Sequence, residues 1–239
     1  MKVLDLFSGL GGFSAAFKER GHEVVTLDLD YRFNPTYCRD IMSIENIDSL
    51  GKFDVVLASP PCEKYSIAAS SFHHWRKERD VYVPNSKDAE RALKLTSHLF
   101  WLLENTYSGK YWVVENPRGY MRKVFGKPQY EIDQCQYGLR YRKATDFWGK
   151  LPESFKPKKC TKPKECLHIK VSHSWEAWRH DDRAKIPYSL SRNLLGTRNG
   201  VTMNYYKRNK FASEVRNPAL RALIAPGLSL EVCKACEVA

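Results

Sequence analysis

Two residues in the first half of the chain could together carry out nucleophilic catalysis. Cys62 follows two prolines, which stiffen the backbone and fix where the next side chain points. A cysteine thiolate is reactive near neutral pH when its surroundings lower its pKa. Glu115 follows an apolar run, and a carboxyl group shielded from water there would have a raised pKa and could hold a proton near pH 7. The simpler alternatives are a buried structural cysteine and a helix-capping or ion-paired glutamate.

A glycine-rich turn and an acidic residue indicate a second kind of site, one for a nucleoside. Gly9, Gly11 and Gly12 follow a short apolar run and allow a tight turn that a ligand can approach closely. A dinucleotide fingerprint would need glycine where this chain has Ser14, so pyrophosphate binding is not supported. Asp28 ends the next apolar run, where an acid commonly binds ribose hydroxyls. A nucleoside cofactor without a pyrophosphate fits both features, and a purely structural glycine turn is the alternative.

A set of potential metal ligands begins at residue 160. Cys160, Cys166, His168 and His173 offer two thiolates and two imidazoles, which is a complete tetrahedral zinc set. A loop-rich segment with little core could use such a metal for stability. The spacing matches none of the common zinc fingers, so the sequence leaves zinc binding open.

An alternation of strands and helices would position the residues of the first two sites. Apolar runs predict strands at 2–7, 23–27, 53–58 and 111–114, and helices are predicted at 13–20, 88–104 and 228–237. Such an alternation predicts an α/β fold with a mostly parallel sheet and helices on its faces. Ligands of open α/β sheets bind outside the carboxyl ends of the strands. We therefore expect the polar and glycine-rich residues at 8–12, 28–30, 59–62 and 115–117 to converge in space.

The charge of the chain points to a polyanionic partner. The chain has 239 residues, is 43% hydrophobic and carries a net charge of +12, so it is globular rather than disordered. Residues 118–217 hold 23 Lys and Arg against 9 Asp and Glu, a balance of +14, whereas the remainder has a balance of −2. A basic block beside a near-neutral core favours nucleic acid as a partner, whereas a solubilising surface usually mixes both signs.

Targeting signals and cysteine usage bear on the compartment. The sequence contains no apolar run of 18 residues, and its first residues lack a long apolar region followed by a cleavage site. Membrane insertion and secretion are therefore not expected. The seven cysteines, an odd number, are then expected to be reduced thiols of an intracellular, cytoplasmic protein.

Taken in their order along the chain, these motifs resemble the DNA cytosine-5 methyltransferases, in particular the short, phage-like members. Residues 5–13 (DLFSGLGGF) are similar to the cofactor motif of the family, and 59–66 (SPPCEKYS) to its catalytic Pro-Cys loop. Residues 115–117 (ENP) resemble its Glu-Asn-Val motif in the Glu-Asn-Pro form, and 140–142 (RYR) its Arg-x-Arg pair. The resemblance covers roughly residues 1–150.

The resemblance implies a Rossmann-like, S-adenosylmethionine-dependent methyltransferase fold. Residues 1–150 would form the catalytic domain, completed by a C-terminal helix within 218–239, and residues 151–217 would form a small, loop-rich, basic target-recognition lobe. S-adenosylmethionine would be the cofactor. The cofactor-binding residues that the resemblance implies are Phe7, Gly9, Gly11, Asp28, Asp40, Ile41 and Pro60.

The resemblance also implies a covalent mechanism on DNA. Cys62 would add to C6 of cytosine while Glu115 bonds N3 and stabilises the charge that develops on the ring. Arg142 would bond O2 of the base, and Arg140 would support the Cys–Glu pair. Because a base inside a duplex is out of reach, the partner would be double-stranded DNA with the target flipped out, and residues 65–79 resemble the mobile loop that closes over it. No membrane and no obligate protein partner are implied.

Two alternatives stay open at this point. One is a tRNA cytosine-5 methyltransferase, and the other is a catalytically inactive nucleic-acid-binding module on the same fold. The intact Cys62, Glu115 and arginine pair argue against the inactive module. The sequence does not choose among a restriction partner, a viral self-protection enzyme and an orphan enzyme, and it gives neither the recognition sequence nor the oligomeric state.

Overall fold

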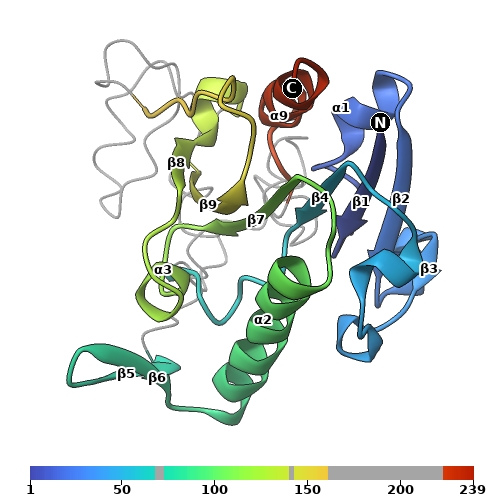
Figure 1. Ribbon diagram of the computed structural model, residues 1–239. Coiled ribbons are helices and arrows are strands. Elements are labelled where there is room, and N and C mark those ends of the chain that lie inside the picture. Colours follow the sequence, from blue (N-terminus) through green and yellow to red (C-terminus); the bar gives the residue numbers. More distant parts are fainter. Residues whose placement is uncertain (68–72, 140–142, 161–222) are drawn as a thin grey trace, which may run out of the picture.

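The computed structural model of the protein describes residues 1–67, 73–139, 143–160 and 223–239. In this part of the chain, a seven-stranded sheet has the order β3-β2-β1-β4-β7-β9-β8 (Figure 1). Its strands are β1 (Lys2–Leu6), β2 (Glu23–Asp28), β3 (Tyr37–Cys38), β4 (Val55–Ala58), β7 (Tyr111–Pro117), β8 (Tyr130–Asp133) and β9 (Ala144–Lys150). The pairings from β3 to β7 are parallel, whereas β9 pairs antiparallel with both β7 and β8. The expected α/β fold with a mostly parallel sheet is confirmed, and the sheet gains an antiparallel edge.

The central strands are apolar on both faces because helices cover both. Val3, Leu4 and Leu6 of β1 are fully buried, and so is every residue of β4. Near-continuous apolar runs of this kind are typical of parallel strands that are covered on both sides. The sheet therefore divides the interior into two hydrophobic clusters, one against each of its faces.

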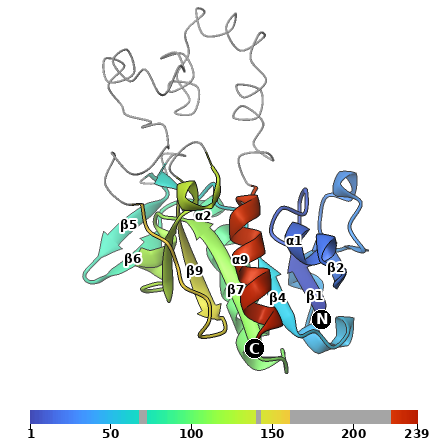
Figure 2. The same cartoon turned by 90° about the horizontal axis from the view of Figure 1, so that it is seen from above.

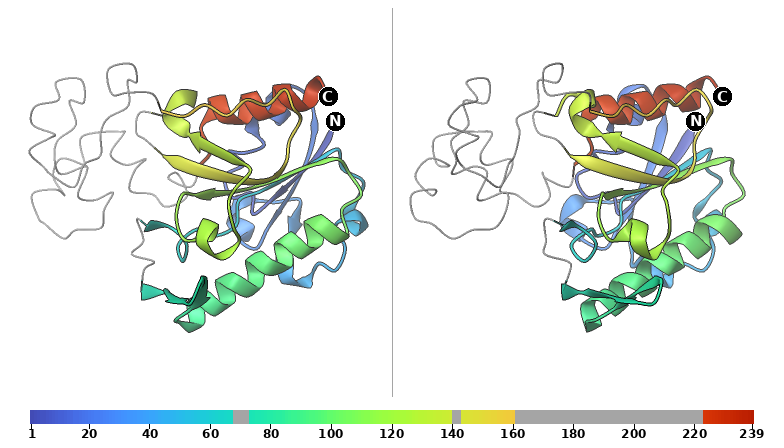
Figure 3. Two further views of the ribbon diagram at one scale, coloured as in Figure 1. Left: turned by 60° about the vertical axis from the view of Figure 1, so that its left-hand side comes forward. Right: turned by 90° about the vertical axis from the view of Figure 1, so that its left-hand side faces the viewer.

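Two groups of helices form the outer layers of the sheet, and two views of the molecule show them on opposite faces (Figure 3). The helices are α1 (Ala15–Glu19), α2 (Lys87–Asn105), α3 (Met121–Val124) and α9 (Pro226–Glu237), with short 3-10 turns at Tyr31–Phe33, Ile41–Ser43, Ile47–Leu50 and Gln134–Tyr137. α2 begins after Ser86, whose hydroxyl accepts a hydrogen bond from the Ala89 amide at 3.2 Å. α9 begins with Pro226 in its first turn, where a missing amide hydrogen costs nothing. The C-terminal helix α9 packs beside α1, so helices from the first and the last part of the chain share one layer (Figure 2).

A two-stranded hairpin that the sequence did not predict lies beside α2. It consists of β5 (Trp75–Glu78) and β6 (Val81–Pro84), paired antiparallel. The ring of Trp75 stacks on Tyr65 with 5.2 Å between centroids, and the Tyr65 hydroxyl donates to Thr96 Oγ1 in α2 at 3.2 Å. Because Tyr65 and Trp75 are both buried, the expected loop over 65–79 is anchored in the core at these two residues.

None of the helices in the described ranges combines the length and the apolar character needed to cross a bilayer.

Candidate active site

A cavity of about 790 Å³ opens at the carboxyl ends of the parallel strands. It receives side chains or backbone from the segments that follow β1, β2, β3 and β4, and from β7. The predicted site residues that line it are Phe7, Gly9, Asp28, Asp40, Ile41, Pro60, Cys62 and Glu115. Gly11 does not line the cavity, and Arg140 and Arg142 lie outside the described residues. The expected convergence of four distant segments is confirmed.

The turn after β1 is held by the carboxylate that ends β2. The Gly9 amide donates to Asp28 Oδ2 at 2.8 Å, and the Asp30 amide donates to Asp28 Oδ1 at 2.9 Å. Gly9 has a φ of +50°, and Phe7 also has a positive φ, of 58°. Glycine adopts this left-handed conformation at little cost, whereas a phenylalanine does so only where the surroundings impose it. Asp28 therefore fixes the turn while keeping free lone pairs on both oxygens for a ligand.

The far wall of the cavity is apolar. Ile41 is buried, and it follows Asp40, whose Oδ1 accepts from the Met42 amide at 2.9 Å and so caps the short 3-10 turn. Leu29 and Leu10 line the same space with 70% and 52% of their surfaces exposed. Exposed leucines that line a concave site offer apolar area to a flat, hydrophobic ligand group.

Asp5 also lines the cavity, and the sequence motifs did not single it out as a site residue. It lies within β1 and is buried, and the Ser14 hydroxyl donates to its Oδ2 at 2.5 Å. Burial raises the pKa of Asp5 to about 7, although the hydrogen bond from Ser14 acts in the opposite direction. In the sequence, Asp5 is the first residue of the 5–13 motif and an acid inside an otherwise apolar strand.

The loop that carries Cys62 leaves the end of β4 and is fastened at both of its ends. Asn116 Nδ2 donates to the Pro60 carbonyl at 3.1 Å, and both groups are buried. The Cys62 carbonyl accepts from the amides of Tyr65 and Ser66 at 2.9 and 2.8 Å, which forms a tight turn. Burial raises the pKa of the Cys62 thiol to about 11, and the nearby Glu115 carboxylate adds to this rise. The thiol is thus protonated at neutral pH in this state of the protein.

Glu115 lies inside β7 rather than after its end, which corrects the predicted strand boundary. Val114 is the last residue of β7 that pairs with β4, and Glu115 continues the strand through its pairing with Phe147 of β9. Glu115 is only 3% exposed, and its Oε1 has no hydrogen-bond partner among the described residues. Burial raises the pKa of this carboxyl group. The strand extension therefore carries a buried carboxyl group past the end of β4 and into the lining of the cavity.

Lys143 is a further cavity residue that the sequence interpretation missed. Its Nζ lies 3.9 Å from Glu115 Oε1 and donates to the Leu223 carbonyl at 3.1 Å. The positive charge of Lys143 lowers the pKa of both Glu115 and Cys62, against the effect of burial. In the sequence, this lysine directly follows the arginines at 140–142, and the residue types alone do not show which cation of that run faces the glutamate.

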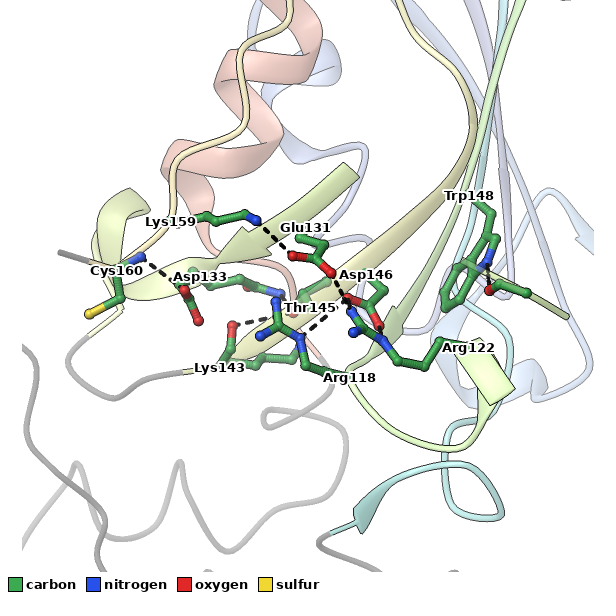
Figure 4. Close-up of polar contacts among 12 residues, drawn as sticks. Arg118, Arg122, Glu131, Asp133, Lys143, Thr145, Asp146, Trp148, Lys159 and Cys160 are labelled. Atoms are coloured by element: carbon green, nitrogen blue, oxygen red, sulfur yellow. Dashed lines mark hydrogen bonds and ion pairs between the residues drawn. The ribbon is translucent and has the colours of Figure 1, made fainter. Parts of the chain in front are cut away.

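A network of ion pairs supports the strand pair that carries Glu115 (Figure 4). Asp146 of β9 is fully buried and lies opposite Asn116 in the register. Arg122 donates to both Asp146 oxygens, from Nε at 2.8 Å and from Nη2 at 2.5 Å, and Arg118 Nε approaches Oδ1 at 3.5 Å. Arg122 also donates to Glu131 Oε1 at 3.1 Å. These contacts tie α3 and β8 to the β7–β9 pair.

The structure describes only part of the possible metal ligands. Cys166, His168 and His173 lie outside the described residues, and the amide of Cys160 donates to Asp133 Oδ2 at 2.9 Å.

A second group, His22, Cys233 and Glu237, has its ligand atoms within 4.8 Å of one another. Both Glu237 oxygens, however, accept hydrogen bonds from Arg20 at 2.7 Å, and His22 contacts Oε1 at 2.8 Å. We interpret this group as an ion-paired contact between α9 and the turn before β2.

Comparisons with known sequences point to one family. A family model described as C-5 cytosine-specific DNA methylase matches residues 1–108. A probable DNA (cytosine-5)-methyltransferase of Frog virus 3 is 31% identical over 196 residues, which cover 75% of this chain and 84% of that protein. A type II methyltransferase of Haemophilus parahaemolyticus is 28% identical over 121 residues, 44% of this chain and 32% of its own. Among solved structures, a methyltransferase of Entamoeba histolytica matches with a TM-score of 0.45 and 13% identity over 68% of this chain and 57% of that one.

Proposed function

Because this chain belongs to the DNA cytosine-5 methyltransferase family, we propose that it transfers a methyl group from S-adenosylmethionine to C5 of cytosine in DNA. The observation that carries the proposal is the shared cavity. The cavity is lined by Cys62, by the buried carboxyl group of Glu115 and by the glycine turn that Asp28 holds. These groups would serve as the nucleophile, the proton donor and the cofactor site of this reaction, and the space they share supports the proposal.

The residues present fit S-adenosylmethionine. A cavity of about 790 Å³ lies within the usual range of roughly 300–1,000 Å³ for ligand sites. Each oxygen of Asp28 accepts one backbone hydrogen bond, which leaves lone pairs for two ribose hydroxyls. Ile41 and Leu29 offer apolar surface for adenine, and Phe7 and Gly9 line the side that we assign to the methionine end. When bound, the cofactor supplies an electrophilic methyl carbon on a sulfonium group.

Glu115 is the proposed proton donor to the base. Its raised pKa favours the protonated carboxyl group, which donates to N3 of cytosine, whereas an ionised carboxylate would only accept. Its Oε1 has no hydrogen-bond partner in the described part of the chain, so the carboxyl group has capacity left for a base. Donation to N3 withdraws electron density from the ring and makes C6 easier to attack.

Cys62 is the proposed nucleophile. Its thiolate adds to C6, and the electron pair displaced from the C5–C6 bond is stabilised through the N3 proton that Glu115 supplies. C5 would then take the methyl group, and the electron pair of the former S–CH3 bond would stay with the sulfonium sulfur. Loss of the C5 proton to solvent re-forms the C5–C6 double bond while the C6–S bond breaks, which returns the electron pair of that bond to the sulfur of Cys62 and the N3 proton to Glu115. Because the thiol pKa is about 11 without substrate, only a small thiolate fraction is present at neutral pH. Protonation of Glu115 removes the carboxylate charge that contributes to this rise, so the form of Glu115 that bonds N3 also favours the thiolate.

DNA is the proposed partner, and a flipped-out cytosine is the proposed substrate form. Cys62 and Glu115 are recessed in a cavity, which a base can enter only outside a duplex stack. The excess positive charge of residues 118–217 suits the phosphate backbone. We further propose that residues 1–150 and 218–239 form the catalytic domain and that residues 151–217 form the recognition lobe.

The test is methyl transfer from labelled S-adenosylmethionine to duplex DNA and to tRNA, offered side by side. We expect label in DNA, no label with Cys62→Ser, and unchanged transfer with Cys38→Ser, which alters an exposed cysteine that does not line the cavity. Label in tRNA alone would mean that tRNA, and not DNA, is the substrate. Full activity of Cys62→Ser would overturn the mechanism.

Trapping separates an enzyme from an inactive binding module. DNA that carries 5-fluorocytosine cannot lose fluorine as a cation after methyl transfer, so the C6–S bond persists and the complex survives denaturing electrophoresis. An inactive module would bind this DNA without any covalent complex.

A further inference from the structure

Lys143 lies in the candidate active site, and neither the family motifs nor the comparisons give it a role. Its side chain is 9% exposed, and that of Glu115 is 4% exposed. The 3.9 Å between Nζ and Oε1 is an ion-pair distance but is longer than a hydrogen bond. The ammonium group therefore acts on Glu115 by its charge and leaves the lone pairs of Oε1 available.

We propose that Lys143 is a positioning residue that serves as the counter-ion of the buried Cys62–Glu115 pair. This inference rests on the proposed function, because it assigns a role at the same site. The resemblance to the family gives the support of this pair to Arg140, which lies outside the described residues. In the described part of the chain, the cation beside the glutamate is Lys143.

The charges around the pair show why a counter-ion is needed. Asp146 acts on Glu115 and Glu63 acts on Cys62, and each of these carboxylates raises the pKa of its neighbour. Lys143 lowers both pKa values. Burial and the two carboxylates favour a pair that holds two protons and no thiolate, and the charge of Lys143 opposes this.

A charge count gives the same result. When Cys62 and Glu115 share one proton, the pair carries one negative charge, whichever of the two holds the proton. The ammonium group of Lys143 balances this charge in both arrangements, so the three groups together carry no net charge while the proton changes place. An uncompensated charge in such a site is strongly disfavoured, and the site would then take up a second proton instead.

The position of Lys143 is fixed from two directions. Its backbone carbonyl accepts from the Gln134 amide at 3.0 Å, immediately before β9 begins at Ala144. Its Nζ donates to the Leu223 carbonyl at 3.1 Å, in the segment that leads into α9. The charge is therefore held in place by groups from outside the strand that carries Glu115.

The proposal is tested by the pH dependence of Cys62 alkylation, in the protein without DNA or cofactor. Iodoacetamide modification of Cys62 is followed by peptide mass spectrometry, with Lys143→Met and Lys143→Arg against the parent. We expect Lys143→Met to move the profile to higher pH and to slow alkylation about tenfold at a fixed pH below the pKa. Lys143→Arg restores the charge and should restore most of the rate.

A matched control is Lys158→Met. Lys158 Nζ lies 3.7 Å from Glu231, a pair of similar length on an exposed face, and its loss should leave the Cys62 profile unchanged. An unshifted profile in Lys143→Met, or an equal shift in Lys143→Arg, would overturn the proposal.

Thermal stability gives a second measurement that does not depend on the thiol. Lys143→Met should lower the melting temperature. Adding Glu115→Gln should recover part of the loss, because the double variant neither buries an unpaired charge nor has to protonate a carboxyl group to avoid one. Simple additivity of the two losses would refute a counter-ion role. Both measurements are independent of methyl transfer, so failure of the proposed function and failure of this inference are distinguishable.

Discussion

Replacing Arg122 by methionine should destabilise the protein through the carboxylate that it leaves behind. Asp146 is fully buried and accepts two hydrogen bonds from Arg122, whereas Arg118 approaches it only at 3.5 Å. Removing one partner of a buried ion pair costs about 3–5 kcal/mol. Arg122 is 27% exposed and Arg118 remains as a second cation, so we expect a smaller loss of stability, about 2–3 kcal/mol. For a chain of this size, the melting temperature should fall by about 4–12 °C.

The assay is thermal unfolding followed by circular dichroism, with two comparisons. Arg76→Met breaks an exposed pair with Glu78 and should cost about 1 kcal/mol or less. The double variant Arg122→Met with Asp146→Leu removes both charges and should recover much of the loss, since an apolar pair of similar volume often replaces a buried ion pair without cost. A double variant that is less stable than Arg122→Met would refute this reasoning, because the damage would then come from lost packing or lost hydrogen bonds and not from a stranded charge.

Three further changes test other parts of the site. In Gly119→Ala the new Cβ would lie 2.1 Å from the backbone carbonyl oxygen of Tyr65, so overpacking of about 1–3 kcal/mol should lower the melting temperature and slow methyl transfer. The folded-state pKa of Asp5 is raised to about 7 from 3.8, so its contribution to stability is present at low pH and is lost as the pH rises through about 7. The melting temperature of Asp5→Asn should therefore rise relative to that of the parent between about pH 4 and pH 7. A difference in melting temperature that stays constant across this range would contradict the reasoning. Asn116→Ala removes the hydrogen bond to the Pro60 carbonyl and should lower kcat about two- to tenfold with little change in cofactor affinity. An equal loss of cofactor affinity would mean that the ligand-binding edge of the sheet had moved, and not the Cys62 loop alone.

The parallel half of the fold and the cofactor side of the site could be predicted from the sequence. Apolar runs that end in glycine, proline or acid mark both the strands and their carboxyl ends, and these ends must lie at one edge of a parallel sheet. Phe7, Asp28 and Cys62 therefore come together as expected. These positions can be predicted because the local sequence determines them, since each strand ends where its apolar pattern ends.

The antiparallel half could not be predicted in the same way. The residues of β8 and β9 do not follow a simple apolar pattern, because β9 buries the polar residues Thr145 and Asp146 next to the apolar Phe147 and Trp148. A buried acid interrupts the strand pattern unless its partner is known, and that partner, Arg122, comes from α3. For the same reason the end of β7 was placed too early, since Glu115 belongs to the strand only through its pairing with Phe147.

The antiparallel direction of β9 explains how a lysine that is distant in sequence reaches the catalytic edge. Parallel strands present their carboxyl ends at the ligand edge, whereas an antiparallel neighbour must begin there. β9 begins at Ala144, which places Lys143 beside the end of β7 and within ion-pair distance of Glu115. A sheet of parallel strands alone would put the amino end of the next strand at the opposite edge, so the lysine could not meet the glutamate in this way. The reversed strand thus supplies the positive charge that the buried Cys62–Glu115 pair requires.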